Sequence, residues 1–285
     1  MPNAGPIALF DSGEGGLTVL RHLVERFPQE QFLYAADSGH FPYGEKSLDE
    51  VRQWFLSFVD FFLQKGARAV IIACNTATAA ALPIAKRRYD IPILGVVEAA
   101  VSRAVELTRN GRVGVLCTEA TYKSGLYPRE LQSLNPTLEV AVKPCPILVQ
   151  MVENGHTDGA PVEDEVRQCV EPVLTRQVDT IILGCTHFPH MRDVFNRVVG
   201  QEVSIVDPGE EIVEYLPLEL DLAQGSGAPR PVLAWTSGDP AQFATVTAKL
   251  CPQIPMVTRP LRWADQQLAE EAPVLALDTG EAERG

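Results

Sequence analysis

Short apolar runs alternate with amphipathic segments along most of the chain. Runs such as IALF at 7–10 have the length of buried strands, and segments such as 17–27 repeat apolar residues at helical spacing. Continuous apolar strands that alternate with helices are typical of parallel sheets covered on both faces. The pattern therefore predicts an α/β fold.

The expected elements form two sets, followed by a shorter C-terminal part. In the first set we expect strands at 7–10, 32–36, 69–73 and 93–97, with helices at 17–27, 47–66 and 75–89. In the second set, which follows a helix at 98–109, we expect strands at 113–117, 138–142, 180–184 and 203–206, with helices at 119–133, 146–154, 162–177 and 187–199. The C-terminal part is expected to hold a helix at 209–222, a turn-rich connection at 225–231, one further strand and a helix at 240–250. The last twenty or so residues are acidic with little apolar content, and we expect them to fray.

Two of the expected strands end in a similar way, each running into a cysteine with polar neighbours. The first reads VIIACNT at 70–76 and the second IILGCTH at 181–187. Ligands of parallel α/β sheets bind beyond the carboxyl ends of the strands, where Asp11, Ser12 and Thr118 also stand. Two half-molecules that face each other would therefore place Cys74 and Cys185 on opposite walls of one cleft.

The two thiols suggest proton-transfer chemistry. A thiol at a helix N-terminus sees backbone N–H groups and the positive end of the helix dipole, which lower its pKa. Two thiols on opposite sides of a bound anion could remove a proton from one face of a carbon and deliver another to the opposite face. Such an enzyme inverts a stereocentre without a cofactor, while Asn75, Thr76, Thr186 and His187 hold the substrate.

Other interpretations use fewer of these residues. A Cys-His hydrolase or transferase would use Cys185 as the nucleophile and His187 as the base, and a non-catalytic pair of carboxylate-binding domains would use neither thiol. A metal site built on Cys185, His187 and His190 matches no common zinc spacing. The loop DSGEGG at 11–16 lacks the third glycine of a dinucleotide fingerprint, since Thr18 stands there.

Composition narrows the class of protein. The chain has 285 residues, 46% of them hydrophobic, and a net charge of -13 without basic clusters, which argues against nucleic acid or an anionic membrane as a partner. Six scattered cysteines without CxxC spacing indicate a reducing cytoplasm. Since no signal-peptide pattern is present and no run reaches about 18 apolar residues, we expect neither secretion nor a transmembrane helix.

Seven stretches together resemble the glutamate racemases of the cofactor-independent aspartate/glutamate racemase superfamily. They are FDSGEGGLTVL from Phe10, FPYGEKS at 41–47, ACNTATA at 73–79, GVVEAA at 95–100, CPILVQMVENG at 145–155, GCTHFP at 184–189 and VDPGEEI at 206–212. The resemblance runs in family order over roughly residues 7–250, and the pairing of ACNTATA with GCTHFP is its most specific part.

The resemblance implies an architecture and an activity. The fold would be two flavodoxin-like parallel-sheet α/β domains related by pseudo-symmetry, with the active site in the cleft between them. The first domain would comprise 1–97 and 207–265, the second 98–206, and 266–285 would be a frayed tail. The enzyme would be a cytoplasmic homodimer that interconverts L-glutamate and D-glutamate for peptidoglycan, with no metal or other cofactor.

The resemblance also assigns roles to individual residues. Cys74 and Cys185 would be the two acid/bases, assisted by Asp11, Glu153 and His187. The substrate would be bound by residues that match the family's binding positions: Asp11, Ser12, Pro42, Tyr43, Gly44, Asn75, Thr76, Thr118, Thr121, Thr186 and His187. Two departures stand out, since Glu14 replaces an apolar residue and Pro208 a common serine. Glu14 would add negative charge near an anionic ligand.

Overall fold

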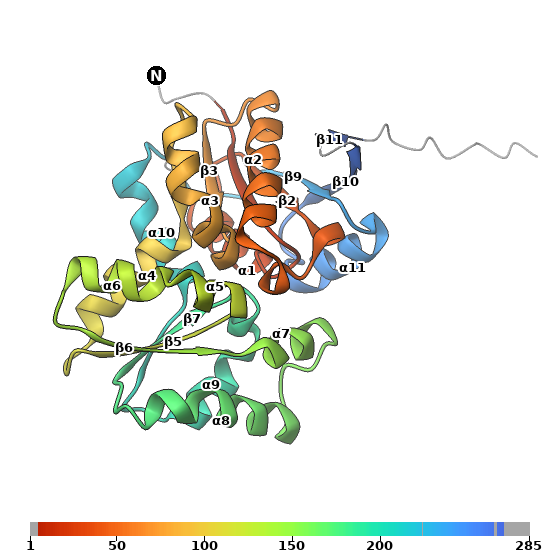
Figure 1. Ribbon diagram of the computed structural model, residues 1–285. Coiled ribbons are helices and arrows are strands. Elements are labelled where there is room, and N and C mark those ends of the chain that lie inside the picture. The colour runs from red at the N-terminus through yellow and green to blue at the C-terminus, as the bar shows by residue number, and fades with distance from the viewer. Residues whose placement is uncertain (1–4, 224, 265–266, 271–285) are drawn as a thin grey trace, which may run out of the picture.

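The molecule has two lobes, and each lobe is built around its own sheet (Figure 1). The computed structural model describes residues 5–223, 225–264 and 267–270. Helices lie on both faces of each sheet, as the alternating pattern of the sequence predicted. The predicted α/β class is therefore confirmed.

Within the described residues, seven strands form the larger sheet. They are β1 (Ile7–Asp11), β2 (Phe32–Ala36), β3 (Ala69–Ile72), β4 (Ile93–Gly95), β9 (Val232–Thr236), β10 (Met256–Ala264) and β11 (Gln267–Glu270). Their order is β11-β10-β9-β2-β1-β3-β4, and only the β10–β11 pair is antiparallel.

The smaller sheet is entirely parallel within the described residues. Its strands are β5 (Arg112–Cys117), β6 (Glu139–Pro144), β7 (Thr180–Gly184) and β8 (Ser204–Val206), in the order β6-β5-β7-β8. The larger sheet contains the same order in β2-β1-β3-β4. The two lobes are therefore pseudo-symmetric, with β1 equivalent to β5 and β3 equivalent to β7.

The helices complete the two lobes. Around the larger sheet lie α1 (Leu17–Arg26), α2 (Leu48–Gln64), α3 (Asn75–Arg88), α10 (Pro208–Glu219) and α11 (Pro240–Leu250), with the 3-10 turns η1 (Ser38–His40) and η2 (Tyr43–Glu45). The smaller sheet is accompanied by α4 (Val96–Leu107), α5 (Glu119–Ser124), α6 (Leu126–Leu134), α7 (Pro146–Glu153), α8 (Ala160–Leu174) and α9 (Arg192–Val199), with the 3-10 turn η3 (Phe188–Met191). No helix in the described ranges is both long and apolar enough to cross a bilayer.

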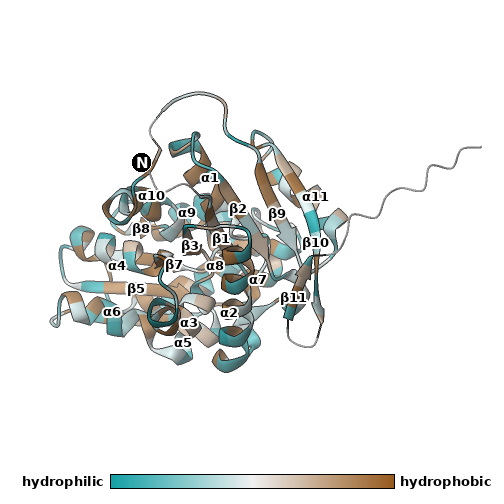
Figure 2. Ribbon diagram, turned by 90° about the horizontal axis from the view of Figure 1, so that it is seen from above, coloured by the Kyte–Doolittle hydropathy of each residue, from teal (hydrophilic) through white to brown (hydrophobic). Residues whose placement is uncertain are grey.

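The cores form because successive side chains of a strand point to opposite faces of its sheet. In β1, Ile7 and Leu9 join the cluster under α1 and α10, whereas Ala8 and Phe10 join the cluster under α2 and α3. Figure 2 shows the central strands in the brown of apolar residues, with hydrophilic teal on the outer parts of the helices. Burial on both faces explains why these strands are continuously apolar.

Helix α2 begins as its sequence predicted. Ser47 Oγ accepts a hydrogen bond from the backbone N–H of Glu50 at 3.3 Å, and the Glu50 carboxylate accepts one from the N–H of Ser47 at 3.1 Å. This reciprocal capping box satisfies two of the backbone donors that a helix start leaves free. Gly66 follows the helix at φ +78°, a left-handed conformation that glycine adopts without strain.

Several element boundaries differ from those expected. Strand β4 ends at Gly95 and not at Val97, because the Glu98 side chain accepts from the Gly95 N–H at 2.9 Å and begins α4. The helix expected over 119–133 is divided at Gly125, which has φ +64°. The helix expected over 187–199 begins as η3, and β6 runs to Pro144.

The secondary structure expected for the C-terminal part of the chain was wrong in part. β10 was not anticipated, and residues 267–270 of the supposed frayed tail form β11, paired with β10. Both strands alternate exposed and half-buried positions along most of their length, so they lack the continuous apolar run that identified the other strands. The rest of that tail, 266 and 271–285, lies outside the described residues.

The domain limits remain a prediction. Helix α4 contributes Val96 and Ala99 to the core of the larger lobe, and Val97, Ala100 and Val101 to the core of the smaller one. A helix shared in this way joins the lobes, so the described packing gives no sharp boundary at 97/98.

Candidate active site

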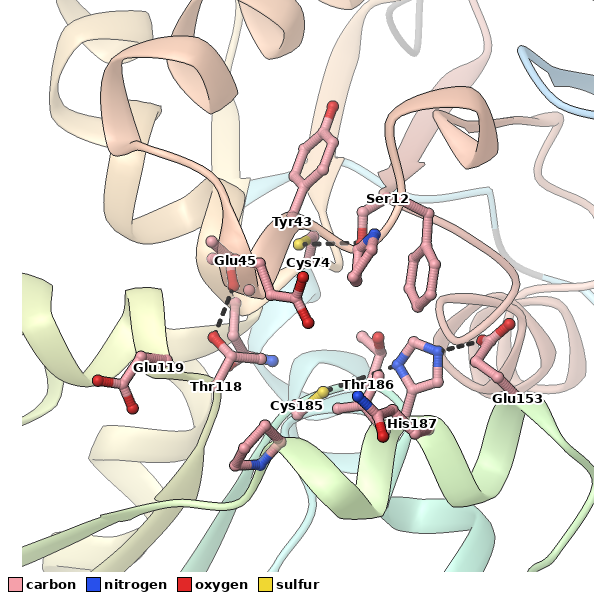
Figure 3. Close-up of a pocket in the computed structure, with 18 of the residues that line it drawn as sticks. Ser12, Tyr43, Glu45, Cys74, Thr118, Glu119, Glu153, Cys185, Thr186 and His187 are labelled. Atoms are coloured by element: carbon pink, nitrogen blue, oxygen red, sulfur yellow. Dashed lines mark hydrogen bonds and ion pairs between the residues drawn. The ribbon is translucent and has the colours of Figure 1, made fainter.

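A cavity of about 360 Å³ lies between the two lobes (Figure 3). It opens at the carboxyl ends of the strands of both sheets, which is where parallel α/β proteins bind ligands. Its walls contain both thiols, with Cys74 on one side and Cys185 on the other. Cys74 follows β3 and Cys185 follows β7, so the thiols occupy equivalent positions in the two pseudo-symmetric sheets.

Cys74 is held at the start of α3. Its sulfur accepts from the backbone N–H of Ala77 at 3.4 Å and lies 3.6 Å from Ser12 Oγ. Burial raises the pKa of the Cys74 thiol to about 12, and the nearby Asp11 carboxylate contributes in the same direction. The expectation that the helix N-terminus lowers this pKa is therefore wrong for Cys74, because desolvation outweighs the single N–H contact.

Cys185 belongs to a chain of three side chains. Its sulfur lies 3.7 Å from Nδ1 of His187, whose Nε2 lies 2.6 Å from Oε1 of Glu153. Burial alone would lower the pKa of His187, but its hydrogen bonds to Cys185 and Glu153 raise that pKa to about 10. An imidazolium thus stands beside the Cys185 sulfur at neutral pH, where it stabilises negative charge and can exchange a proton.

Asp11 supports the cavity from behind its wall. Its carboxylate accepts from the backbone N–H groups of Gly13 and Gly16, and Thr186 Oγ1 donates to it across the lobes at 3.4 Å. Burial raises the pKa of Asp11 to about 6, although His187 and the backbone donors oppose this. Asp11 thus links the loop after β1 to the loop that carries Cys185.

Another part of the cavity's surroundings contains three threonine hydroxyls and one asparagine side chain. Thr76 Oγ1 lies 2.9 Å from Thr118 Oγ1 and 3.2 Å from Thr121 Oγ1, so the cluster bridges the lobes. Tyr127 donates to Oδ1 of Asn75 at 2.6 Å. The buried Nδ2 of Asn75 has no hydrogen-bond partner in the described part of the chain, and it is therefore a free donor for a ligand.

The structure brings most of the predicted residues to the cavity wall. Those on the wall are Ser12, Pro42, Tyr43, Gly44, Cys74, Asn75, Thr76, Thr118, Glu153, Cys185, Thr186 and His187. Asp11 and Thr121 are not among the lining residues, and they contact the wall through Thr186 and through Thr76 and Thr118. Their roles in binding stay predictions.

Several further residues line the cavity that the sequence pattern did not indicate. They are Phe41, Glu45, Glu119, Pro146, Val149, Gln150 and Asn154. The sequence contained a signal for three of them, because all three lie on α7 together with Glu153. Pro146, Val149 and Gln150 lie seven, four and three residues before Glu153 in this helix. Positions so spaced share one face of a helix, and the choice of Glu153 therefore implied them.

Glu14, the departure noted in the sequence, lies close to this site. It is largely buried and accepts from Ser38 Oγ at 3.3 Å. Burial raises its pKa, and the charge of Glu153 adds to the effect. The extra acid thus shares its surroundings with Glu153 and His187.

A possible metal-binding group lies elsewhere. Among the described residues, His22, Asp207 and Glu210 place their ligand atoms within 4.8 Å of one another. The Arg192 guanidinium lies 2.8 Å from Glu210 and 3.7 Å from Asp207, so a cationic side chain already neutralises the carboxylates. Neither these residues nor Arg192 line the cavity with the thiols.

The fold and the site define a class of protein: a two-lobed α/β enzyme whose equivalent strands carry two thiols to one cleft. The model of the Asp/Glu/Hydantoin racemase family matches residues 13–216. The chain belongs to this family, as its sequence motifs indicated.

Individual relatives narrow the similarity further. The chain is 45% identical over 252 residues to the glutamate racemase of Symbiobacterium thermophilum, covering 87% of this chain and 91% of that one. A glutamate racemase isoform of Bacillus anthracis superposes with a TM-score of 0.84 at 31% identity, over 90% of this chain and 97% of that one. The structure of glutamate racemase from Francisella tularensis in complex with D-glutamate superposes with a TM-score of 0.82 at 29% identity, over 92% of this chain and 98% of that one.

Proposed function

We propose that this protein is a glutamate racemase, which interconverts L-glutamate and D-glutamate by proton transfer at Cα. The observation that carries the proposal is the placement of Cys74 and Cys185 at the ends of equivalent strands, on opposite walls of one cavity. The glutamate racemases of Symbiobacterium thermophilum and Bacillus anthracis, similar over most of their length, support the substrate.

The reaction needs one thiolate and one thiol. In the L-to-D direction, the Cys185 thiolate takes the Cα proton and leaves the electron pair on Cα. The Cys74 thiol then donates its proton to the opposite face, so the product has the inverted configuration. Cys185 ends as a thiol and Cys74 as a thiolate, which is the starting state for the reverse direction.

The surroundings of each thiol suit this exchange. At Cys185, His187 can hold a proton because Glu153 and the sulfur keep its pKa high. At Cys74, burial keeps the thiol protonated, ready to donate, while Ser12 and the Ala77 N–H contact the sulfur. Cys74 is therefore held as a proton donor, and Cys185 has an imidazole beside it with which a proton can be exchanged.

Glutamate is an anion with two carboxylates, and the cavity offers matching donors. The N-terminus of α3, from Asn75, and the N-terminus of α5, after Thr118, both open on it. Helix N-termini bind carboxylates through free N–H groups and the helix dipole. The hydroxyls of Thr76 and Thr118 and the free Nδ2 of Asn75 add side-chain donors.

The biological setting follows from the same proposal. D-glutamate would serve peptidoglycan synthesis in the cytoplasm, and the six cysteines, which are all unpaired, suit a reducing compartment. A homodimer and a reaction without metal or other cofactor are expected from the resemblance of the sequence to its family.

One experiment tests the proposal. The purified protein is incubated with L-glutamate in heavy water without added cofactor, and proton NMR and optical rotation are followed. We expect loss of rotation together with deuterium at Cα. Unlabelled and optically unchanged glutamate would contradict the proposal. It would favour the Cys-His hydrolase or transferase, which needs only Cys185 and His187, or the non-catalytic pair of carboxylate-binding domains.

A further inference from the structure

A fully buried carboxylate, that of Asp37, connects the cavity wall to the C-terminal strands. Asp37 directly follows β2 and is 0% exposed. Its Oδ1 accepts from Ser237 Oγ at 2.6 Å and from Trp263 Nε1 at 2.9 Å. Its Oδ2 accepts from the Tyr43 hydroxyl at 2.5 Å and lies 3.0 Å from His40 Nδ1. Both oxygens are thus fully used inside the protein, and Asp37 does not line the cavity.

The partners of Asp37 come from distant parts of the chain. His40 and Tyr43 belong to the segment after β2, whereas Ser237 follows β9 and Trp263 lies in β10. The β9 and β10 strands enter the larger sheet only after the chain has built the smaller lobe. The carboxylate therefore ties the segment 38–44 to strands that arrive late in the sequence.

Tyr43 shows what this tie does for the cavity. Tyr43 and Gly44 line the cavity, but the Tyr43 hydroxyl points away from it toward Asp37 (Figure 3). Burial and the Asp37 charge raise the Tyr43 pKa well above its usual value, so the hydroxyl stays a donor. Because the Tyr43 hydroxyl donates to Asp37, other atoms of Tyr43 line the cavity. The hydroxyl therefore anchors Tyr43 to Asp37 and does not bind the ligand.

The anchored turn also meets the other lobe. A Cβ added to Gly44 would lie 2.9 Å from Thr118 Cβ, which leaves no room for a side chain there. A small shift of the 43–44 turn would therefore change the spacing to Thr118, one of the hydroxyls that face the cavity. Rigid support of such a turn preserves binding geometry, because loosely held groups lose affinity.

We propose that Asp37 is a positioning residue of the racemase, whose carboxylate holds the Tyr43–Gly44 turn against the substrate by means of donors from the C-terminal strands. This inference rests on the proposed function for its kinetic consequence, but its structural consequence stands alone. Asp37 acts through Tyr43 and does not touch the substrate.

The test replaces Asp37 by asparagine, which keeps the shape but has one acceptor oxygen and one NH₂ group that cannot accept. We expect KM for glutamate to rise about tenfold or more, the size of one hydrogen bond to a charged group, with a smaller change in kcat. Hydrogen–deuterium exchange should accelerate at the amides of 38–46. Because Tyr43→Phe and Asp37→Asn alter the same hydrogen bond, the double variant should raise KM by a smaller factor than the product of the factors of the two single variants.

A matched control separates positioning from general destabilisation. Asp60 accepts from the Tyr89 hydroxyl at 2.8 Å on the outer surface of α2, away from the cavity. Asp60→Asn removes a similar tyrosine–carboxylate contact and should leave KM and exchange at 38–46 unchanged. If Asp37→Asn fails to fold, Trp263→Phe removes a single donor and should raise KM and local exchange by a smaller factor, whereas Arg259→Gln on the same strand should do neither.

Each outcome decides whether Asp37 positions the Tyr43–Gly44 turn. Wild-type KM and wild-type exchange at 38–46 in the folded Asp37→Asn protein would overturn the proposal. So would an equal rise in exchange along the whole chain, or a fall in kcat with unchanged KM. If the wild-type protein does not racemise glutamate, the proposed function fails, while local exchange at 38–46 still decides whether Asp37 positions the turn.

Discussion

Nε2 of His187 lies 2.6 Å from Oε1 of Glu153, a contact between the loop after β7 and the end of α7. On its other side, His187 meets the sulfur of Cys185 at 3.7 Å. The imidazole therefore bridges a carboxylate on the rim of the cavity and a thiol in its wall. These two contacts raise the His187 pKa to about 10 against the opposing effect of burial.

Glu153→Gln should weaken the Cys185 side of the reaction. The amide cannot hold the imidazolium by charge, so the His187 pKa should fall toward its usual value of about 6.5. We expect kcat from L-glutamate to drop by about 10²-fold, the lower range for one general acid/base, with a smaller loss for exchange from D-glutamate. NMR titration of the imidazole and initial rates with each enantiomer test this. An unchanged titration would show that Glu153 does not control His187.

Replacement of either thiol should separate the two half-reactions. By the handedness expected from the family resemblance, Cys185→Ala should keep some Cα exchange from D-glutamate and lose it from L-glutamate, and Cys74→Ala should show the reverse. Racemisation should fall by about 10²-fold or more in both, because each variant lacks one proton carrier. Proton NMR in heavy water measures the exchange. Wild-type racemisation by either variant would contradict the two-base mechanism.

Gly15→Ala should disturb the contact between the lobes beside Cys185. A Cβ at Gly15 would lie 2.5 Å from Thr186 Oγ1 and 3.0 Å from His187 Nδ1, too close for an unshifted structure. We expect a destabilisation of about 1–3 kcal/mol, typical of overpacking, together with a large loss of activity. Denaturant unfolding and rate measurements test both parts.

Gly66→Ala serves as the control for Gly15→Ala. Gly66 has φ +78°, and apart from its chain neighbours no heavy atom of the described residues lies within 4 Å of an added Cβ, so alanine is strained there without a clash. The Gly66→Ala protein should lose about 1 kcal/mol of stability, because alanine is strained at this positive φ, and it should keep its activity. Equal loss of activity in both variants would mean that Gly15 matters only for stability.

Asp11 should make stability depend on pH in the acidic range. Its pKa is raised from 3.8 to about 6, chiefly by burial, so between these values the folded state binds more protons than the unfolded one. The stability of the wild type relative to Asp11→Asn should therefore fall as the pH rises from about 4 to 6, by about 3 kcal/mol, and stay constant above. Urea unfolding of both proteins at several pH values measures the difference. A difference that grows in favour of the wild type over this range would contradict the raised pKa.

Activity should not depend on a bound metal. The cavity residues that carry the proposed chemistry are two thiols, an imidazole and a carboxylate, and proton transfer between them balances without a metal ion. Incubation with a chelator, followed by gel filtration, should leave the racemisation rate unchanged. Loss of activity that a divalent ion restores would show that the reaction needs more than these side chains.

Local pattern was enough to predict the central fold. The strands that lead to Asp11, Cys74 and Cys185 are buried on both faces, so their apolar runs are continuous and easy to recognise. Because parallel strands expose their carboxyl ends at one edge, the two cysteines could be placed in a common cleft before any coordinates were known. Strands β10 and β11 were not recognised because alternate side chains along both strands are exposed, so neither contains a continuous apolar run.

The sequence by itself determined the succession of strands and helices up to α11 and the residues at the strand ends, because these follow from the spacing of apolar side chains along one segment. Only the tertiary structure decided how those residues act. The Cys74 pKa depends on burial in the folded protein, which outweighs the effect of its own helix. The four contacts of Asp37 join positions up to 226 residues apart, and no local pattern encodes such pairs. Solvation and long-range contacts are properties of the folded molecule as a whole, and for that reason the pattern of residues within one segment does not predict them.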